Sequence, residues 1–582
     1  MLSSNFAQSS SKFLCIVGGC EEELDTTSIN NLHRYDQGLD YLSIGNIGLS
    51  GYRLLYNIED YSMFSISRTI GNKKYLPKQF DVKRPYTELS YILGSKEEQV
   101  LGVLHTQNIS EQANFSFGFD KVKSTGFYNN QASNNNHLFA NIWFSTKKEK
   151  YKISLNIDHE RIFNEHNGGI QYDSIFEQDL LLNRNRELMD VNLSLASSTI
   201  KRSELQLNQK FRFMQSLDSL NNGVSHALYV NAKGFINERV YKDSILNMDF
   251  YDEILFDSLT TNDKVKFEGV EGVLGYEFSN RKRNQSIVFS PYVKWQSINY
   301  DQHLIDTNVS TLSVGTDLSI SQKKFQLKLE GDYHLHGYRN SDVDFKSEFS
   351  YVLSENWSFG ILGSFNSVSP SLDLLSYYGN NISWENTFST TEYINLSGKI
   401  FSKKHKTSIS VAYNDVFNPV YFNFIGEPQQ IDGVSQIIQL TAQKEFQIQK
   451  WSIKPKMVYQ YNGGYNIYRL PEYYTDLVIG YKTQMYKNNL NIFIGADVVY
   501  YAPTDMMAFS PMVNQYYLDD TKAAGNYPFV DIFLNARIKT VRFFVKATHV
   551  NSGLFGYKYY GANHYPLKDR TIQFGLNWIF IN

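Results

Sequence analysis

The sequence predicts an all-β protein: a large transmembrane antiparallel β-barrel of about 22–24 strands, with an even strand number. Three observations support this prediction. The last strand of the chain has one apolar and one polar face, and the same alternation recurs from about Pro85 onward. Short and long connections between the strands also alternate along the chain. No linker or change of composition divides this region, so one closed sheet accounts for all of it.

The closing strand lies within Asp569 to Asn582. Successive side chains of a strand point to opposite faces. One face is apolar and the other is mostly polar: the first holds Ile572, Phe574, Leu576, Trp578 and Phe580, and the second holds Gln573, Gly575 and Asn577. Such a strand, with an aromatic residue near its end, is typical of a barrel wall that separates lipid from a wet lumen.

Composition excludes several classes of protein. The chain has 582 residues, of which 42% are hydrophobic and 15% aromatic. It has no run of about 18 apolar residues, which excludes a helical membrane bundle. The net charge of -3 gives no basic surface for nucleic acid. Both cysteines, Cys15 and Cys20, lie in the N-terminal tail, so the rest of the chain has neither a disulfide framework nor a thiolate metal site.

Residues 1–84 are polar and poorly periodic at their start, and we expect an N-terminal periplasmic or lumen-associated segment there. No export signal is evident, because the best apolar stretch, 13–17, is shorter than the roughly 7–15 residues that such a signal needs. The outer-membrane barrel is expected over 85–582. Its first strand alternates from Thr87 to Leu93.

The polar faces of later strands indicate where the lumen lies. Between Tyr151 and Asp158, and again between Phe325 and His336, apolar side chains alternate with charged or amide side chains. A lysine that faces lipid at mid-depth costs about 2–4 kcal/mol, so the charged face must be the wet one. The residues expected to face the lumen are Lys152, Asn156, Asp158, Lys328, Glu330, Asp332, His334, Asp497 and Lys546. Their mixed signs favour salt bridges that brace the wall over a ring of one sign that selects ions.

His334 and His336 are expected on one strand face together with Glu330 and Asp332. Imidazoles two residues apart on a strand can bind a divalent metal with the help of carboxylates. A wet interior also collects such side chains without any metal, and we favour that interpretation, so no metal site is predicted. No catalytic residue or cofactor is predicted either, because the chain lacks a G-x-S-x-G motif, a P-loop and a dinucleotide fingerprint.

The connections between strands alternate in length. Short turns follow Ser321, Ser402, Gln447, Lys487 and Lys539, and long polar loops lie at 368–391, 418–433, 462–473, 502–526 and 552–568. Short periplasmic turns and long outer loops are typical of outer-membrane barrels. One stretch, 238–264, leaves the strand parity open, because an even count would need a further strand there.

Two tyrosine pairs lie in the long loops, Tyr377 with Tyr378 and Tyr516 with Tyr517. Such rings can stack on a ligand or form the aromatic girdle at a membrane surface. We expect the girdle.

Several stretches resemble one known family when they are taken together. They are Pro85-Tyr-Thr-Glu-Leu-Ser-Tyr91, Gly94-Ser-Lys-Glu-Glu-Gln99, His105-Thr-Gln-Asn108, Gly126-Phe-Tyr-Asn-Asn-Gln131, Glu165-His-Asn-Gly-Gly169, Ser376-Tyr-Tyr-Gly-Asn-Asn381, Trp384-Glu-Asn386 and Gly575-Leu-Asn-Trp578. From about Tyr41 to its end the chain resembles the "putative porin" family of Gram-negative outer-membrane beta-barrel proteins. The resemblance implies an outer-membrane barrel that passes solutes, and it carries over no functional residues.

The expected function is a porin-like channel for the passive diffusion of small hydrophilic solutes, without catalysis. Its partners would be outer-membrane lipid and those solutes, with no nucleic acid, and the sequence leaves any oligomeric partner open. The alternative is the barrel of an energised receptor-transporter for a specific ligand, because outer-membrane transporters of about 22 strands have a plugged lumen. A surface-binding barrel, whose loops hold a partner, is a third interpretation.

Overall fold

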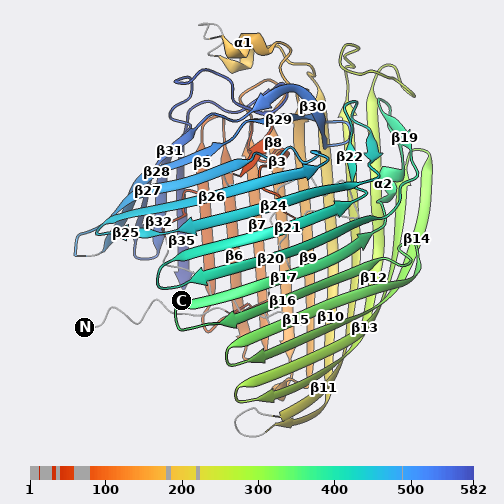
Figure 1. The fold of residues 1–582 in the computed structure, drawn as a ribbon, viewed down its shortest axis with the longest axis vertical. Helices are drawn as coiled ribbons and strands as arrows, with labels where there is room; N and C mark the ends of the chain where they lie inside the picture. Colours follow the sequence, from red (N-terminus) through yellow and green to blue (C-terminus); the bar gives the residue numbers. More distant parts are fainter. Residues whose placement is uncertain are drawn as a thin grey trace.

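One closed antiparallel barrel forms most of the molecule (Figure 1). The computed structural model describes residues 12–13, 29–34, 40–57, 79–178, 185–217, 223–487 and 489–581. The barrel has 22 strands, which confirms the predicted fold class and the even strand number. The last wall strand closes on the first, with Gln573 opposite Gly94 and Ile581 opposite Tyr86.

The wall strands follow one another around the barrel in chain order. They are β5 (Tyr86–Gly94), β6 (Gln99–Ser110), β7 (Ala113–Ser124), β8 (Ser133–Ser145), β9 (Tyr151–His166), β10 (Ala196–Leu217), β11 (Gly223–Asp243), β12 (Thr261–Lys282), β13 (Gln285–Gln302), β14 (Ile305–Gln322), β15 (Phe325–Gly337), β16 (Val343–Val352), β17 (Trp357–Val368), β20 (Thr391–Ser402), β21 (Thr407–Phe417), β24 (Val434–Lys444), β26 (Trp451–Gly464), β27 (Tyr473–Met485), β28 (Leu490–Tyr501), β31 (Phe529–Ile538), β32 (Val541–Thr548) and β35 (Thr571–Ile581). A short strand, β25 (Phe446–Ile448), continues β24 along the same edge of β26 and is counted with it.

The pleat of the strands sorts side chains to the two faces of the wall. On β35, Ile572 and Phe574 are 52% and 54% exposed, whereas Gln573 between them is 0% exposed. Gln573 lies opposite Lys546 of β32, which is also buried, so both side chains point into the barrel. The apolar face therefore meets lipid and the polar face meets the interior.

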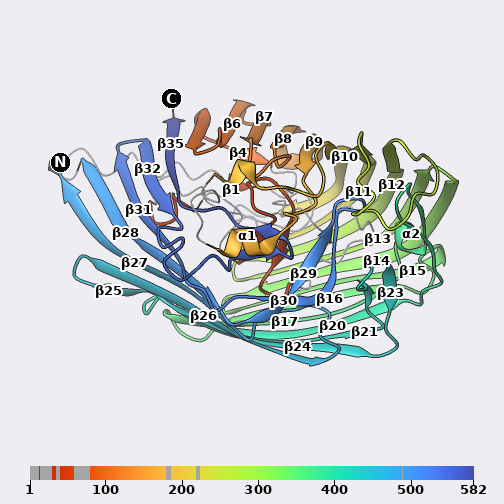
Figure 2. The same cartoon turned by 90° about the horizontal axis from the view of Figure 1, so that it is seen from above.

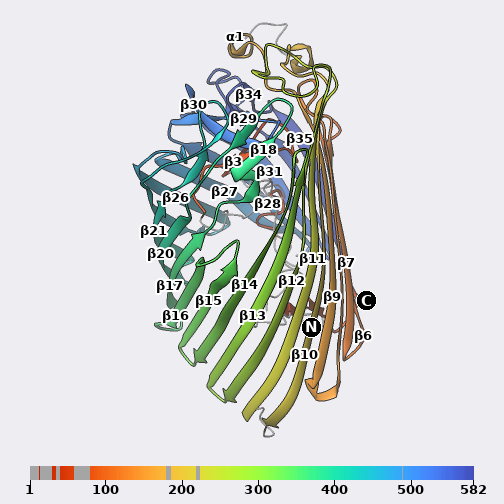
Figure 3. The same cartoon turned by 90° about the vertical axis from the view of Figure 1, so that its right-hand side faces the viewer.

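The two ends of the barrel differ. The connections at the end where the chain terminates are short, as at 283–284, 323–324 and 539–540, and the long loops lie at the other end. Strands β10, β11 and β12 have 22, 21 and 22 residues. In the side view they reach beyond their neighbours at the end with the short turns (Figure 3).

The stretch 238–264 contains no additional strand in the part of it that the structure describes. Strand β11 continues to Asp243, the loop 244–260 follows, and β12 begins at Thr261. Both strands are longer than the 9–11 residues or so that span a membrane. In the sequence, the end of β11 and the start of β12 therefore resemble an additional strand. The barrel has an even number of strands without such an additional strand.

Short elements decorate both the loops and the N-terminal region. In the loops lie α1 (Asp173–Glu177), a 3-10 turn at Arg186–Leu188, α2 (Leu372–Leu375), β18 (Ser376–Tyr378), β19 (Ser383–Glu385), β22 (Val420–Phe422), β23 (Pro428–Gln430), β29 (Thr504–Ser510), β30 (Gln515–Ala524), β33 (Tyr560–Ala562) and β34 (Tyr565–Pro566), and another 3-10 turn, Lys147–Glu149, joins β8 to β9. Before the barrel lie β1 (Lys12–Phe13), β2 (Tyr41–Ser43), β3 (Gly51–Arg53) and β4 (Phe80–Asp81). Of the residues that the structure describes, none belongs to a helix long and apolar enough to cross a membrane. The stretch 13–17, considered above as an export signal, lies outside the described residues except for Phe13.

The expectation that the loop tyrosines form a membrane girdle is wrong for the two that are most buried. Tyr377 is 2% exposed and stacks on Trp384, with ring centroids 4.8 Å apart. Tyr516 is 8% exposed and packs against Phe509, with ring centroids 5.1 Å apart. The loops that carry these rings fold against one another and the inner wall, which buries the rings away from lipid.

Candidate functional site: the occupied lumen

Part of the N-terminal region lies against the inner wall of the barrel. Its described residues 29–34, 40–57 and 79–84 are here called the lumenal segment. Arg34 donates to both oxygens of Asp476 on β27, at 2.9 and 2.7 Å, and its Nε donates to Asp497 on β28 at 3.0 Å. Bidentate arginine–carboxylate pairs are among the stronger hydrogen-bonded contacts in proteins. The lumenal segment is therefore tied to two neighbouring strands by one side chain.

His33 completes this contact, and its surroundings fix its protonation state. Its Nε2 lies 2.7 Å from Asp497, and its ring stacks on Phe533 with centroids 3.7 Å apart. The Nδ2 of Asn535 donates both to the backbone oxygen of Ile29 and to Nδ1 of His33, each at 2.7 Å. Nδ1 must then accept a hydrogen bond, so the imidazole is neutral with its proton on Nε2. Burial lowers the pKa of His33, although Asp497 opposes this effect.

We call these five side chains the latch: His33 and Arg34 from the lumenal segment, and Asp476, Asp497 and Asn535 from the wall. His33 and Asp497 are 0% and 1% exposed. A charged carboxylate as deeply buried as that of Asp497 requires a partner. The wall carboxylates find their partner in the lumenal segment, so the wall and the segment stabilise each other.

A second anchor holds residues 79–82 to strands β8 and β9, which lie early in the barrel sequence, whereas the latch lies on strands near its end. The indole nitrogen of Trp143 donates to the backbone oxygen of Phe80 at 2.8 Å. Gln79 donates to the hydroxyl of Ser154 at 2.8 Å. Phe80 is 0% exposed and packs with Val82 in a small buried cluster.

The hairpin of β2 and β3 forms a third anchor beneath the loops. Gln460 of β26 donates to the backbone oxygen of Leu54 at 2.9 Å. Asn46 and Gln131 exchange side-chain to backbone bonds, because Asn46 donates to the oxygen of Gln131 and Gln131 donates to the oxygen of Ile44, both at 2.9 Å. The apolar side chains of this hairpin join clusters that also contain loop residues.

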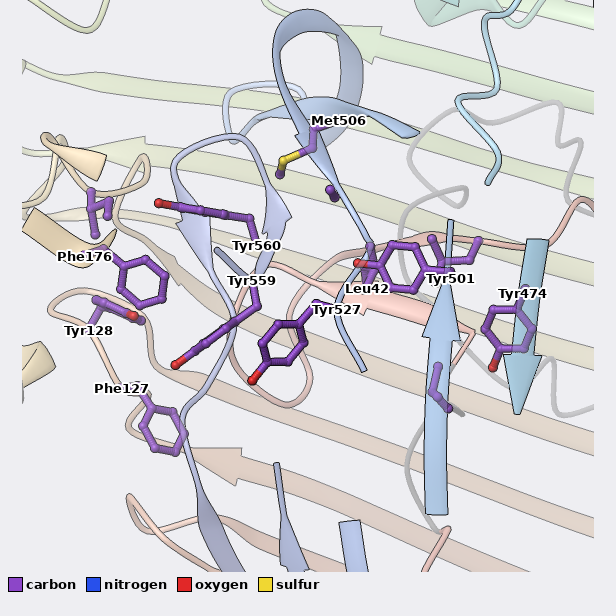
Figure 4. Close-up of a cluster of buried hydrophobic side chains, with 14 of the residues drawn as sticks. Leu42, Phe127, Tyr128, Phe176, Tyr474, Tyr501, Met506, Tyr527, Tyr559 and Tyr560 are labelled. Atoms are coloured by element: carbon purple, nitrogen blue, oxygen red, sulfur yellow. The ribbon is translucent and has the colours of Figure 1, made fainter. Parts of the chain in front are cut away.

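The loops cover the hairpin from the outside. Seen from above, α1 and the strands β29 and β30 lie across the mouth, within the outline of the wall (Figure 2). The close-up shows Leu42 of the hairpin in one cluster with rings from several loops and strands (Figure 4). These rings are Phe127, Tyr128, Phe176, Tyr474, Tyr501, Tyr527, Tyr559 and Tyr560. The outer mouth is thus packed with aromatic side chains above the lumenal segment.

Most of the predicted lumenal residues contact a partner side chain. Seven of the nine do so: Lys152 lies over the ring of Trp143 (5.3 Å), Asn156 donates to Gln206 (3.4 Å), Asp158 contacts His137 (2.9 Å), Asp332 pairs with Lys294 (2.8 Å), His334 with Asp344 (3.2 Å), Asp497 with His33 (2.7 Å) and Lys546 with Asp531 (3.0 Å). The other two, Lys328 and Glu330, form no ion pair with the described residues. Whether any of the nine lies on a solute path stays a prediction.

The structure separates His336 from His334. Ser313 lies opposite His334 and Leu312 opposite His336, so one extra residue, Leu335, is inserted into β15. A bulge of this kind reverses the face of the residues beyond it. His334 is 2% exposed and inward, whereas His336 shares the outward face of Leu312, which is 37% exposed. The expectation that both imidazoles share one face is therefore wrong.

The residues that anchor the lumenal segment have no signal in the sequence. His33, Arg34 and Gln79 lie in stretches without periodicity, and Asn535 and Gln460 look like ordinary polar residues of a strand. Their importance comes from contacts between distant parts of the chain, which are 442 residues apart for Arg34 and Asp476 and 75 residues apart for Gln79 and Ser154.

The closed wall with its apolar outer face and polar inner face defines an outer-membrane β-barrel protein. The family model described as "Putative porin" matches residues 21–582, and the chain belongs to this family. No curated protein matches the sequence.

Solved structures with a similar fold include three barrels. The iron transporter FrpB of Neisseria meningitidis has 12% identity and a TM-score of 0.57, covering 86% of this chain and 82% of its own. The siderophore receptor PiuA of Acinetobacter baumannii has 11% identity and a TM-score of 0.60, covering 94% of each chain. The ferric-catecholate import receptor Fiu of E. coli K12 has 12% identity and a TM-score of 0.58, covering 86% and 82%. None of these titles names an enzyme.

The expectation of a passive channel for small hydrophilic solutes is wrong. The barrel has the strand number of plugged outer-membrane transporters. The solved structures that it resembles are a transporter and receptors for iron and siderophores, and not open diffusion pores.

Proposed function

We propose that this protein is an energised outer-membrane receptor-transporter for a specific ligand, in which residues 1–84 act as the lumenal plug and residues 85–582 as the barrel. One observation carries the proposal: the described part of the N-terminal region is anchored inside the barrel at three separate places, by the latch, by Trp143 and by Gln460. A ligand that crosses this lumen must displace the lumenal segment or pass beside it.

The need for energy follows from the number and burial of these anchors. Each hydrogen bond that is broken while its partner stays buried costs about 1–3 kcal/mol. The latch alone contains two such bonds at the fully buried Asp497 and two more between Arg34 and Asp476. Thermal motion opens such a set of contacts rarely, so useful transport requires that binding of a ligand and an external source of work open it.

Planar-bilayer conductance tests whether the lumen is closed. The full-length protein is expected to be silent, and the chain without residues 1–84 is expected to give large, steady steps. The full-length variant Glu160→Gln is a matched control, because Glu160 pairs with Arg202 of the wall at 2.9 Å and not with the latch; it should stay silent. Steady open steps from the full-length protein would overturn the proposal.

Uptake into cells tests the energised step. The similar structures are those of an iron transporter, a siderophore receptor and a ferric-catecholate import receptor, so a ferric catecholate labelled with radioactive iron is the first probe. We expect uptake that depends on this protein and stops when a protonophore collapses the membrane potential. Uptake that continues unchanged with the protonophore would contradict an energised mechanism.

A further inference from the structure

A sector of the inner wall on β11 to β15 carries acidic and tyrosine side chains. One row across the strands runs from Tyr229 to Gly275, Tyr292, Gly315 and Asp332, each directly opposite the next. In the neighbouring row Asp317 lies directly opposite Glu330. Residues in one row of a sheet point to the same face, and this face is the inner one because it also carries the buried His334.

Two glycines give the tyrosine rings their positions. A Cβ on Gly275 would lie 2.1 Å from Cζ of Tyr229, and a Cβ on Gly315 would lie 2.4 Å from Cζ of Tyr292. Both rings therefore occupy the space that a side chain on the next strand would fill. The Cβ that would be added to Gly315 also lies 2.6 Å from Oδ1 of Asp332, so the ring of Tyr292 lies beside that carboxylate.

The acidic side chains of this sector are only partly neutralised. Glu277 pairs with Lys210 at 2.6 Å, and Asp332 pairs with Lys294 at 2.8 Å. Asp317 and Glu330 form no ion pair with any residue that the structure describes.

The lysines that lie nearest to Glu330 in the sheet do not neutralise Asp317 or Glu330. Lys346 lies opposite Glu330, but its amine bonds to Glu348 at 2.9 Å. Lys328 is two residues from Glu330 on β15, and it contacts neither Asp317 nor Glu330 within ion-pair distance.

Two buried oxygen atoms in this sector lack a well-aligned hydrogen bond to any residue that the structure describes, although the Tyr292 hydroxyl approaches the carboxylate of Asp332. They are the hydroxyl of Tyr229, a residue that is 3% exposed, and Oδ1 of Asp332. The Tyr229 hydroxyl lies within electrostatic range of the carboxylates of Asp317, Asp332 and Glu277. Unpartnered buried polar atoms are rare in native proteins and need an explanation, such as a bound group.

We propose that Asp317, Glu330, Asp332 and Tyr229 form a binding site for a primary ammonium group on the lumenal wall. An ammonium group donates three hydrogen bonds and accepts none, which suits the three carboxylates and the oxygen of the phenol, whose own O–H can donate to one of those carboxylates. The face of Tyr292 adds a favourable surface for a cation. A bare metal ion fits less well, because the described acidic and histidine residues form no group that could hold one. The proposal rests on the transport function above and deepens it by assigning a primary amine to the ligand as one of its groups.

Isothermal titration of the purified full-length protein with 1,4-diaminobutane tests this site. We expect saturable binding that weakens with added salt, and no binding of the uncharged 1,4-butanediol. The double variant Asp317→Asn/Glu330→Gln should weaken diamine binding at least tenfold, and Glu330→Gln alone should weaken it severalfold. The lumenal variant Glu160→Gln removes the same charge elsewhere and should bind the diamine within twofold of the wild type.

Three outcomes would overturn the site: diamine binding that is equal in the wild type and in Glu330→Gln, equal binding of the diol, or binding of Mg²⁺ without binding of the diamine. The single variant serves if the double variant does not fold, because Glu330 is exposed and makes no ion pair with the described part of the chain. The titration needs no transport. Diamine binding without ferric-catecholate uptake would therefore count against the transport proposal alone, and uptake without diamine binding would count against this site alone.

Discussion

Two sectors of the inner wall follow the same strand alternation but differ in what faces them. The latched sector, on β27, β28 and β31, points Asp476, Asp497 and Asn535 at the lumenal segment, and Asp497 and Asn535 are buried there. The open sector, on β14 and β15, points Asp317 and Glu330 inward with no cation bonded to either among the described residues. Glu330 is exposed, whereas Asp497 is 1% exposed.

The difference shows that facing the lumen does not determine a residue's role. An inward carboxylate of the latched sector holds the protein's own chain, and the inward carboxylates of the open sector have no bonded cation among the described residues. The proposed receptor-transporter would need both kinds of wall, because one must keep the plug in place and the other must remain accessible to the ligand. Substitutions in the two sectors should therefore have effects of very different size.

The largest effect is expected from Arg34→Ala in the latch. The substitution leaves Asp476 and Asp497 without the guanidinium, while Asp497 stays buried. Removing one partner of a buried ion pair costs several kcal/mol, and because Arg34 is 21% exposed we expect about 3 kcal/mol of lost docking energy. Hydrogen exchange of the peptides covering 29–57 should then be about 100-fold faster, since each 1.4 kcal/mol is roughly tenfold.

Arg34→Lys separates charge from geometry in the same experiment. Lysine keeps the positive charge but lacks the planar fork that bonds to both oxygens of Asp476. We expect an intermediate acceleration of exchange. If Arg34→Ala leaves exchange of the segment at the wild-type rate, the latch does not hold the plug.

The fold could be predicted from the sequence because the lipid imposes a simple rule on every wall strand. A charged side chain on the lipid face is costly, so alternations such as Ile572, Gln573 and Phe574 must be preserved along each strand. The bulge at Leu335 could not be predicted. Polar and apolar residues still alternate in the sequence of β15 across this position, so nothing there marks Leu335 as an inserted residue.

The candidate site was much less predictable than the wall. Asp497 was expected to face the lumen, but nothing near it in the sequence indicates that His33 and Arg34 are its partners. Periodicity reports which face a residue is on, and it carries no information on contacts between distant parts of the chain. The passive channel was expected for this reason: the lumenal segment has no periodic pattern, so its position inside the barrel was not visible in the sequence.

A smaller effect is expected from Trp143→Phe, which tests the second anchor. Phenylalanine keeps an aromatic ring but removes the N–H that donates to the backbone oxygen of Phe80 at 2.8 Å. The buried carbonyl group is left without a donor, which should cost about 1–2 kcal/mol. Hydrogen exchange around Phe80 should accelerate while exchange around Arg34 should not. Equal acceleration at both places would mean that the lumenal segment undocks as one unit.

The pH dependence of docking should be smaller still and specific to His33. Burial lowers the pKa of His33 below its ordinary value of 6.5, so the undocked histidine takes up a proton more readily than the docked one. The contribution of His33 to docking is therefore complete above pH 6.5 and is lost as the pH falls below it, by at most about 1.4 kcal/mol per pH unit. Exchange of 29–34, corrected for its intrinsic pH dependence, should rise on acidification in the wild type. The variant His33→Gln should lack this rise, and a rise of the same size in that variant would assign the effect to another group.

The smallest effect on stability is expected in the open sector, from Glu330→Gln. Glu330 is exposed and has no ion pair among the described residues, so its replacement by the amide of the same shape should change the stability of the barrel by no more than about 0.5 kcal/mol. Thermal unfolding in detergent should superimpose on the wild type, and exchange of 29–57 should be unchanged. Asp497→Asn is the matched variant in the latched sector, because it also neutralises one inward carboxylate, and it should accelerate exchange of the same peptides clearly. If the two variants behave alike, the two sectors do not differ in function, and the inward carboxylates merely brace the wall throughout the barrel.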